Sequence, residues 1–339
     1  MKIAVVGAGA IGGYLGGWLA ASGEEVTFIA RGANLEAIRA RGMRVIGDDG
    51  ADVVVRGALA CERMSEAGPQ DVVLLTVKAN QVAAVAADIQ HLCHEQTTIV
   101  TMQNGIPWWY FHKHGGEFEG TSIRSADPDG AIGRLIDSER IIGSVVYPAA
   151  TLVQPGVVEV VEGRRFALGE LDGSSSARVQ AISAAFVKAG FKAPILDHIR
   201  SEIWLKVWGN LSFNPISALT HATLVDLLQF PETRALSVEM MREAEVIAGK
   251  LGITFRAGID RRIAGAEKVG AHKTSMLQDV EAGKAIEIEA LVGAVVELGR
   301  LTSTPTPHID AVYACARLLA ETLKRQNGKL AISPLWAVT

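Results

Sequence analysis

Cysteine is scarce in this chain of 339 residues, and the three cysteines stand far apart. Cys61, Cys93 and Cys315 form no CxxC pair, which argues against a disulfide framework and a thiolate metal site. The histidine stretches HLCH (91–94) and HKH (112–114) offer no third and fourth ligand nearby, so we expect no metal. A reducing cytoplasm fits this cysteine usage best.

Long apolar runs and an excess of either charge are also missing. No apolar run approaches the roughly 20 residues that span a bilayer, and no signal peptide is recognisable. The net charge is −4, so the chain has no basic field for phosphate backbones. We therefore expect neither a membrane nor nucleic acid as a partner. GxSxG and HExxH motifs are absent, which leaves hydrolase chemistry without support.

The first part of the chain alternates apolar strands with helical stretches. We expect strands over residues 2–6, 24–31, 71–78 and 97–105, and a helix over residues 10–22. Near-continuous apolar strands that alternate with helices indicate a parallel sheet covered on both faces. Short β-rich runs over 141–169 predict an antiparallel extension, followed by a helix over 178–190 and a short strand over 193–197.

From Ile199 onward the pattern is helical throughout. We expect helices over residues 199–214, 231–250, 257–271, about 275–282, 285–301 and 307–326. The length also favours two domains rather than one. The sequence thus predicts an α/β N-terminal Rossmann-type dinucleotide-binding domain over residues 1–197, followed by an all-α C-terminal domain over residues 198–339.

A GxGxxG motif stands between the first strand and the first helix. Gly7, Gly9 and Gly12 are its glycines, and Ala8, Ala10 and Ile11 complete the turn. Such glycines allow a tight turn, a close approach of a pyrophosphate to the backbone, and packing of helix against strand. The context predicts dinucleotide binding, and a merely structural glycine turn is the alternative.

Arg31 follows the second strand, where NAD enzymes usually place an acidic residue for the ribose 2′-hydroxyl. A guanidinium suits a 2′-phosphate, so we predict NADP(H); the alternative is a solvated loop arginine. Lys78 and Asn104 stand where two further strands end, and ligands of parallel sheets bind at such ends. We expect both to face the cofactor, although each is equally compatible with an ordinary loop residue.

A polar stripe runs along an otherwise apolar helix, IWLKVWGNLSFNP (203–215). Lys206, Asn210 and Asn214 are four residues apart and therefore share one face of the helix. A solvated face would carry more charge, and the surrounding tryptophans indicate burial. A buried ammonium needs a carboxylate partner or a functional reason. Glu287 and Glu289 are downstream candidates, of which a helix would allow only one to face the site.

These motifs together resemble the ketopantoate reductase (2-dehydropantoate 2-reductase) family. The resemblance rests on GAGAIG, VKANQV, QNG, KVWGNLSFNP and SMLQD, the last followed by the acidic stretch IEIE, so it covers nearly the whole chain. It implies an NADPH-dependent reduction of a 2-keto acid with Lys206 as general acid, a role that suits an ammonium beside a developing alkoxide. It also implies a place in pantothenate biosynthesis.

The same resemblance implies roles for the remaining site residues. Asn210 and Asn214 would hold the substrate, and Ser275 would bind its carboxylate. Asn104 would meet substrate or nicotinamide, and Lys78 the cofactor. Glu287 would lie by the nicotinamide ribose and the lysine, raising the lysine pKa that burial lowers. A backbone contact with the cofactor is implied near Ala149.

Two stretches depart from the family pattern. Thr223 and Leu224 stand where the family commonly has an asparagine that touches the distal part of the substrate. The connection over residues 106–140 is longer than usual and rich in aromatic residues, and long loops are often functional. Its aromatic residues are compatible with a lid or lining of the substrate entrance, which we slightly favour, and with a subunit contact.

Three functions remain open on the sequence alone. The first is reduction of 2-dehydropantoate to pantoate, and the second is reduction of a different 2-keto acid by a paralogue. The third is a non-catalytic NADP(H)-binding redox sensor, which the intact polar set disfavours because a sensor needs no general acid. The apolar C-terminal helices are compatible with a core or a homodimer contact.

Overall fold

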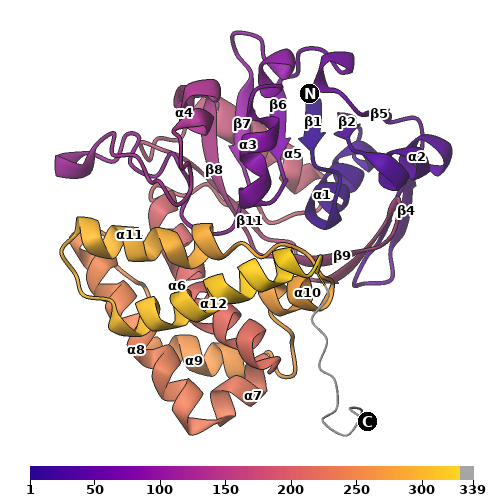
Figure 1. Cartoon of the computed structure of the whole chain (residues 1–339). Coiled ribbons are helices and arrows are strands. Elements are labelled where there is room, and N and C mark those ends of the chain that lie inside the picture. Colours follow the sequence, from indigo (N-terminus) through magenta and orange to yellow (C-terminus); the bar gives the residue numbers. More distant parts are fainter. Residues whose placement is uncertain (329–339) are drawn as a thin grey trace, which may run out of the picture. The chain divides into compact units, whose positions relative to one another are not determined.

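The computed structural model describes residues 1–328 (Figure 1). Residues 329–339 of the predicted helical domain lie outside the described residues. The chain divides into two compact units, Met1–Ile203 and a second that starts at Trp204, so the division falls inside helix α6 (Ile199–Thr220). Each unit has its own buried residues and is described by itself.

The first unit is built on a seven-stranded sheet with the strand order β11-β8-β7-β6-β1-β2-β5. Its strands are β1 (Lys2–Val6), β2 (Glu25–Ile29), β5 (Leu59–Cys61), β6 (Val72–Leu75), β7 (Thr98–Thr101), β8 (Ile141–Val146) and β11 (Phe166–Glu170). All neighbours pair in parallel except β8 and β11, which are antiparallel. The predicted parallel sheet with an antiparallel extension is therefore confirmed.

A second, four-stranded sheet has the order β4-β3-β10-β9 and was not predicted as a separate sheet. It consists of β3 (Met43–Ile46), β4 (Asp52–Val55), β9 (Ala149–Gln154) and β10 (Val157–Glu162). Helix α1 (Ala10–Ala21) contacts strands of both sheets. A Cβ at Gly16 would lie 2.6 Å from Phe28 of the first sheet, and one at Gly17 would lie 2.6 Å from Val45 of the second. The small residues of α1 thus let two sheets approach one helix.

The other elements of the first unit are short, apart from α2 and α5. They are α2 (Gly32–Arg41), η1 (Met64–Glu66), η2 (Ala79–Gln81), α3 (Val82–Ala86), η3 (Ile89–Leu92), η4 (Gly116–Phe118), α4 (Ala131–Leu135), η5 (Ser138–Arg140) and α5 (Ala177–Lys188). The strand predicted over 193–197 is wrong. Within this segment only Ile195 forms an isolated bridge, with Leu168 of β11, and Pro194 has no N–H to donate to a ladder.

The second unit is helical over its described residues, as predicted. Its elements after α6 are α7 (Leu224–Gln229), α8 (Pro231–Lys250), α9 (Ile259–Glu267), α10 (Ser275–Glu281), η6 (Glu289–Gly293), α11 (Ala294–Leu301) and α12 (Pro307–Arg325). Helix α8 contacts α7, α9, α11 and α12, and Met241 of α8 accepts a hydrogen bond from the buried indole of Trp208. Helix α8 is thus the centre of the unit.

Helix α7 was not predicted, the helix predicted over 257–271 is shorter, and two further helix boundaries differ from the predicted ones. Helix α6 continues past Pro215 to Thr220, because a proline removes a single donor and the buried Ile216 and Ala218 hold the following turns. The helix predicted over 285–301 begins later, with the π-helical turn η6 (Glu289–Gly293) leading into α11. Within residues 1–328, no helix combines the length and the apolar character that crossing a membrane requires.

Candidate functional site

The glycine turn joins β1 to α1 with the conformation that its sequence requires. Gly7 has a φ of +101°, which other residues rarely adopt. A Cβ at Gly12 would collide with the Gly7 carbonyl oxygen and lie 2.5 Å from Thr76 Oγ1, so the third glycine allows helix and turn to approach. Thr76 Oγ1 in turn donates to the Gly7 carbonyl at 2.8 Å, which fixes the turn against the end of β6.

Gly9 differs from the other two glycines because a Cβ there would meet nothing within 4 Å. It is also the N-cap of α1 and provides no capping side chain for the first helical N–H groups. Open space beside uncapped N–H groups at a positive helix end is the surrounding that a pyrophosphate needs. The residues present therefore fit a dinucleotide.

Arg31 is exposed and is the N-cap of α2, and no ion pair of its guanidinium is seen within residues 1–328.

Asn34, in the first turn of α2, was not predicted from the sequence. Its Nδ2 donates to the Ala8 carbonyl at 2.7 Å, and its Oδ1 accepts from Gly156 N at 2.8 Å. Asn34 thereby connects the glycine turn to the β9–β10 turn. In the sequence, only its position three residues after Arg31 pointed to a role near the cofactor.

Lys78 and Asn104 follow the carboxyl ends of the neighbouring strands β6 and β7, as predicted from the sequence. Gln103 joins these two ends, because its Nε2 donates to the carbonyls of Leu75 at 2.7 Å and Val77 at 2.9 Å. Gln103 belongs to the QNG motif, and only its bridging role was missed. Both predicted residues are partly exposed, as a ligand contact requires.

Ala149 lies elsewhere in the first unit, at the start of the edge strand β9, where it pairs with Glu162. It is partly exposed. The sheet that carries it packs on α1, the helix that follows the glycine turn. Its predicted contact with the cofactor stays a prediction.

The aromatic side chains of the 106–140 connection are packing residues of the first unit. Trp109, Tyr110 and Phe111 are at most 3% exposed. Trp109 Nε1 donates to Thr101 Oγ1 of β7 at 3.0 Å, and the Tyr110 and Phe111 rings meet edge to face at 5.0 Å. These three side chains are therefore buried in the first unit, and the lid or lining of the substrate entrance and the subunit contact stay predictions for this connection.

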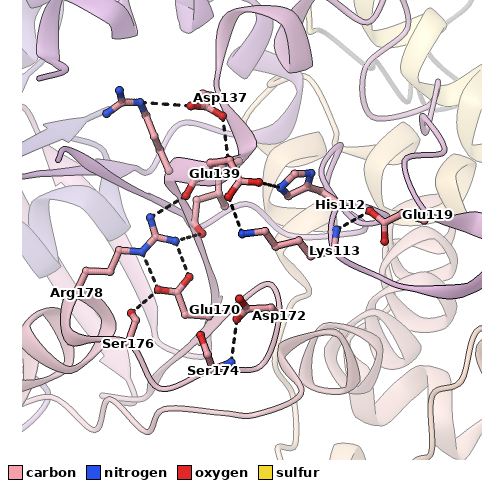
Figure 2. A network of polar contacts seen from close by, with 12 residues as sticks. His112, Lys113, Glu119, Asp137, Glu139, Glu170, Asp172, Ser174, Ser176 and Arg178 are labelled. Atoms are coloured by element: carbon pink, nitrogen blue, oxygen red, sulfur yellow. Dashed lines mark hydrogen bonds and ion pairs between the residues drawn. The ribbon is translucent and has the colours of Figure 1, made fainter. Parts of the chain in front are cut away.

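Polar contacts fasten the same connection to its surroundings (Figure 2). Glu139 accepts from Lys113 Nζ at 2.6 Å and contacts His112 Nε2 at 2.9 Å. The Arg178 guanidinium donates to both carboxylate oxygens of Glu170 and to the Glu139 carbonyl. The ion pair with Lys113 holds the pKa of the Glu139 carboxyl below its usual range. The 106–140 connection is thus held against the rest of the first unit by ion pairs and hydrogen bonds.

Arg200 anchors this connection from the first turn of α6. Its Nε donates to the Tyr110 carbonyl at 2.7 Å, its Nη1 to the Leu171 carbonyl at 2.7 Å and its Nη2 to the His112 carbonyl. Burial holds the pKa of the Arg200 guanidinium below its usual range. No sequence motif marks an arginine that donates to backbone carbonyls rather than to a carboxylate, so the role of Arg200 was not predicted.

In the second unit, α6 carries the polar stripe as predicted, with one face in the core. Trp208 is fully buried and stacks on Phe255 with ring centroids 4.0 Å apart. Lys206 and Asn210 are partly exposed on the other side of the helix. The Asn210 amide makes no hydrogen bond with any residue from 1 to 328, so its donor and acceptor are available to a ligand.

Lys206 has an altered acidity. Burial lowers the pKa of its ammonium from 10.5 to about 8, and the charge of Glu287 opposes this shift. Glu287 precedes the turn of η6, whereas Glu289 inside it accepts from the Tyr313 hydroxyl at 2.6 Å and pairs with Arg317. The two glutamates thus have different partners, as predicted, although Glu287 lies before the helix rather than in it.

Asn214 and Ser275 are also brought together. Asn214 is 5% exposed, and its Nδ2 lies 3.4 Å from Ser275 Oγ, a long hydrogen bond. Ser275 is the first residue of α10, after its N-cap Thr274.

Thr223 lies in the stretch that departs from the family pattern, and it caps α7 through a reciprocal contact with Asp226. The Thr223 hydroxyl therefore has a structural role as the cap of α7.

Over the described part of the chain, no group of three or more His, Cys, Asp or Glu side chains is arranged to hold a metal ion. The predicted site residues are divided between the two units. The first unit contains the glycine turn, Lys78 and Asn104, and the second contains Lys206, Asn210, Asn214, Ser275 and Glu287.

The chain is similar to known proteins along most of its length. Residues 3–173 match the family model described as "Ketopantoate reductase PanE/ApbA", and residues 198–320 match the model of its C-terminal part. A protein of Mesorhizobium japonicum named 2-dehydropantoate 2-reductase is 53% identical over 94% of this chain and 98% of its own length.

Solved structures agree in fold along nearly the whole chain. One from Ralstonia solanacearum is 39% identical with a TM-score of 0.90, covering 95% of this chain and 98% of that one. The 2-dehydropantoate 2-reductase of Geobacter metallireducens is 28% identical with a TM-score of 0.82, covering 94% of this chain and 99% of that one.

Proposed function

The chain belongs to the ketopantoate reductase family, and on that premise we propose that it reduces 2-dehydropantoate to pantoate with NADPH. The reaction consumes the 2-keto acid, NADPH and one proton, and yields the 2-hydroxy acid and NADP⁺. The observation that carries the proposal is Lys206, an ammonium with a pKa of about 8 in a stripe of amides. A 53% identical relative bears the name of this activity.

We propose that residues 1–197 hold the cofactor. The turn from Gly7 to Gly12 receives the pyrophosphate at the uncapped start of α1. Arg31 binds the 2′-phosphate, because a guanidinium offers two parallel donors to phosphate oxygens. Lys78 and Asn104, at the ends of β6 and β7, contact the cofactor, and Ala149 contributes a backbone contact. When bound, NADPH supplies the hydride.

We propose that the helical domain, residues 198–339, holds the substrate and its proton donor. Lys206 donates the proton to the carbonyl oxygen as negative charge develops there, and its pKa of about 8 keeps it largely protonated at neutral pH. Glu287 keeps the lysine charged and binds the nicotinamide ribose. Asn210 and Asn214 hydrogen-bond the substrate, with Ser275 beside Asn214 taking its carboxylate. Asn104 adds a substrate contact.

One alternative is favoured by a specific feature, and another is disfavoured. The stretch after α6 lacks the polar residue that the family usually has there, and Thr223 caps a helix, which favours a paralogue acting on a different 2-keto acid. A non-catalytic NADP(H)-binding sensor is disfavoured, because a sensor gains nothing from an ammonium that costs stability to bury.

The deciding experiment measures NADPH oxidation with a panel of 2-keto acids that includes 2-dehydropantoate. We expect turnover with 2-dehydropantoate and a large loss of kcat in Lys206→Ala. Turnover with another acid alone would select the paralogue, and the absence of turnover with every acid would refute the reductase.

The cofactor preference needs its own variant. Arg31→Asp introduces a carboxylate where the 2′-phosphate is proposed to bind, so KM for NADPH should rise far more than KM for NADH. Arg56→Asp makes the same charge change at another exposed arginine and should leave both values unchanged. Equal losses for NADPH and NADH in Arg31→Asp would show that Arg31 does not read the phosphate.

A further inference from the structure

Both ends of the Asn34 amide are occupied by backbone groups of distant segments. The Nδ2 donates to the Ala8 carbonyl at 2.7 Å, and the Oδ1 accepts from Gly156 N at 2.8 Å. The opposite orientation of the amide would set a donor against the Gly156 N–H and an acceptor against the Ala8 carbonyl, so the side chain has one orientation. Asn34 thus holds the glycine turn, α2 and the β9–β10 turn in one arrangement.

The first of these hydrogen bonds fixes a peptide group of the glycine turn. The Ala8 carbonyl belongs to the same peptide unit as Gly9 N, which donates to the Gly7 carbonyl at 2.7 Å. In a trans peptide these two groups point in opposite directions, so Asn34 and Gly7 hold the unit from both sides. The peptide that leads into the N-cap of α1 therefore depends on Asn34 for its orientation.

The second hydrogen bond joins the amide to a turn that is itself packed on α2. The Gly156 carbonyl accepts from Arg44 N of β3 at 2.8 Å. Gly156 has a φ of +78°, and a Cβ there would lie 3.1 Å from Ala37 Cβ of α2. The β9–β10 turn is thus fixed against both β3 and α2, so it holds the Asn34 side chain in place.

Asn34 shares the start of α2 with Arg31. Arg31 is the N-cap and Asn34 follows three residues later, so the two are neighbours in the first turn. The Arg31 carbonyl accepts from Leu35 N at 3.4 Å, which keeps Arg31 in that turn. Gly32 has a φ of +54°, and a Cβ there would meet nothing in the described part of the chain within 4 Å. Open space therefore lies next to Arg31, as it does at Gly9.

We propose that Asn34 is a positioning residue that sets the place of Arg31 relative to the glycine turn, and thereby strengthens the preference for NADPH over NADH. This inference rests on the proposed function, which puts the pyrophosphate at the glycine turn and the 2′-phosphate at Arg31. One cofactor then has to reach two subsites at once, and a link that fixes their separation before binding lowers the cost of binding. NADH uses only the first subsite, so it gains less from the link.

The test measures the Kd of NADPH and the Kd of NADH by fluorescence titration, so it does not depend on turnover. In Asn34→Ala the Kd of NADPH should rise about 10- to 100-fold, and the Kd of NADH by no more than about threefold. Asn34→Ser leaves a hydroxyl that is too short to join the two backbone groups, and it should show the same contrast. Gln90→Ala is the control, because it removes an exposed amide elsewhere in the first unit, and should leave both constants unchanged.

The link to Arg31 needs a second comparison. Arg31→Ala removes the group that is proposed to bind the 2′-phosphate, so the affinity for NADPH should fall in this variant by itself. If Asn34 acts through Arg31, adding Asn34→Ala to Arg31→Ala should raise the Kd of NADPH by no more than about threefold further. Full additivity of the two changes would overturn the inference, because Asn34 would then act independently of Arg31.

Thermal melting shows that each variant is folded, and Asn34→Ser serves if Asn34→Ala does not fold. Unchanged constants in both Asn34 variants would overturn the inference. Equal losses of affinity for NADPH and NADH would also overturn it, by assigning Asn34 to the pyrophosphate turn alone. If the wild type binds NADPH no more tightly than NADH, the proposed cofactor fails first and the role of Asn34 falls with it.

Discussion

Lys206 and Glu287 are electrostatically coupled within the helical unit: burial lowers the lysine pKa to about 8, and the glutamate charge keeps it from falling further. Burial and the charge of Glu287 therefore act in opposite directions on the pKa of the Lys206 ammonium. The result is a group that is mostly protonated at neutral pH and still able to release its proton.

This coupling predicts the alkaline limb of the pH profile. With Lys206 as the proton donor, kcat/KM should fall above a pH of about 8 as the lysine loses its proton. Glu287→Gln removes the charge that raises the lysine pKa, so the limb should move about one unit to lower pH. Initial rates measured from pH 6 to 10 decide the question.

The control for this shift is Glu289→Gln, two residues away. Glu289 faces Tyr313 and Arg317, so its neutralisation should leave the alkaline limb in place. A limb that does not move in Glu287→Gln, or that moves equally in both variants, would contradict the coupling.

The second prediction concerns the cost of the buried ammonium. Lys206→Met keeps the length of the side chain and removes the charge, so kcat should fall by about 10²- to 10⁴-fold. Stability at pH 7 should rise, by on the order of 2 kcal/mol after allowance for partial solvent access, because the folded chain no longer holds a poorly solvated charge. Urea denaturation with an assay of the same samples measures both effects.

The pH dependence of stability gives an independent check on Lys206. Between pH 8 and 10.5 the unfolded lysine keeps a proton that the folded lysine has lost. The unfolded chain binds more protons in this window, so this group makes the free energy of unfolding rise with pH. Lys206→Met should lack that contribution. A Lys206→Met protein less stable than wild type at pH 7 would refute the cost of burial.

The glycine turn yields the third prediction, a contrast between two glycines of one motif. Gly9→Ala adds a methyl group in open space at a φ of −78°, so the melting temperature should stay close to that of the wild type. The same methyl group obstructs the approach of a pyrophosphate, and binding of NADPH should weaken at least tenfold. Fluorescence titration with NADPH and thermal melting measure the two effects.

Gly12→Ala should behave differently from Gly9→Ala. Its methyl group meets the Gly7 carbonyl oxygen and Thr76, so the melting temperature should fall together with binding. Wild-type affinity for NADPH in Gly9→Ala would show that the open space does not serve the cofactor, and would leave a merely structural glycine turn.

Local patterns along the sequence were enough to predict the parallel sheet, the glycine turn and the polar stripe. The stripe depends only on the helical repeat, which places Lys206 and Asn210 on one face wherever the helix packs. The family resemblance added Ser275, whose contact with Asn214 joins two helices that no spacing rule connects. Oligomeric state and cytoplasmic location stay predictions.

What the sequence did not predict depends on pairing between distant segments. The second sheet joins residues 43–55 to residues 149–162, and β3 meets β10 in parallel across more than half of the first unit. The aromatic residues after Asn104 were interpreted as a lid or lining of the substrate entrance or as a subunit contact, because a sequence does not show which loop residues are buried. Arg200, which binds carbonyls of the same loop, carries no sequence signature either.

The last prediction tests Arg200 as the anchor of the 106–140 connection. Arg200→Met leaves the carbonyls of Tyr110, His112 and Leu171 without their donors. Buried acceptors that lose charge-assisted hydrogen bonds are costly, so the free energy of unfolding should fall by about 2–4 kcal/mol. The connection itself should become the first site of cleavage in limited proteolysis, because its backbone loses the contacts that hold it.

Arg134→Met is the matched control, since Arg134 belongs to the same connection and its guanidinium donates to the Asp129 carbonyl at the exposed surface. This variant should change the free energy of unfolding by no more than about 0.5 kcal/mol. Arg200→Lys should recover only part of the loss, because one ammonium cannot reach three carbonyls in the directions that the guanidinium serves. If Arg200→Met is cleaved no faster than Arg134→Met, the connection is held by its buried aromatic rings alone, and the anchoring role of Arg200 is wrong.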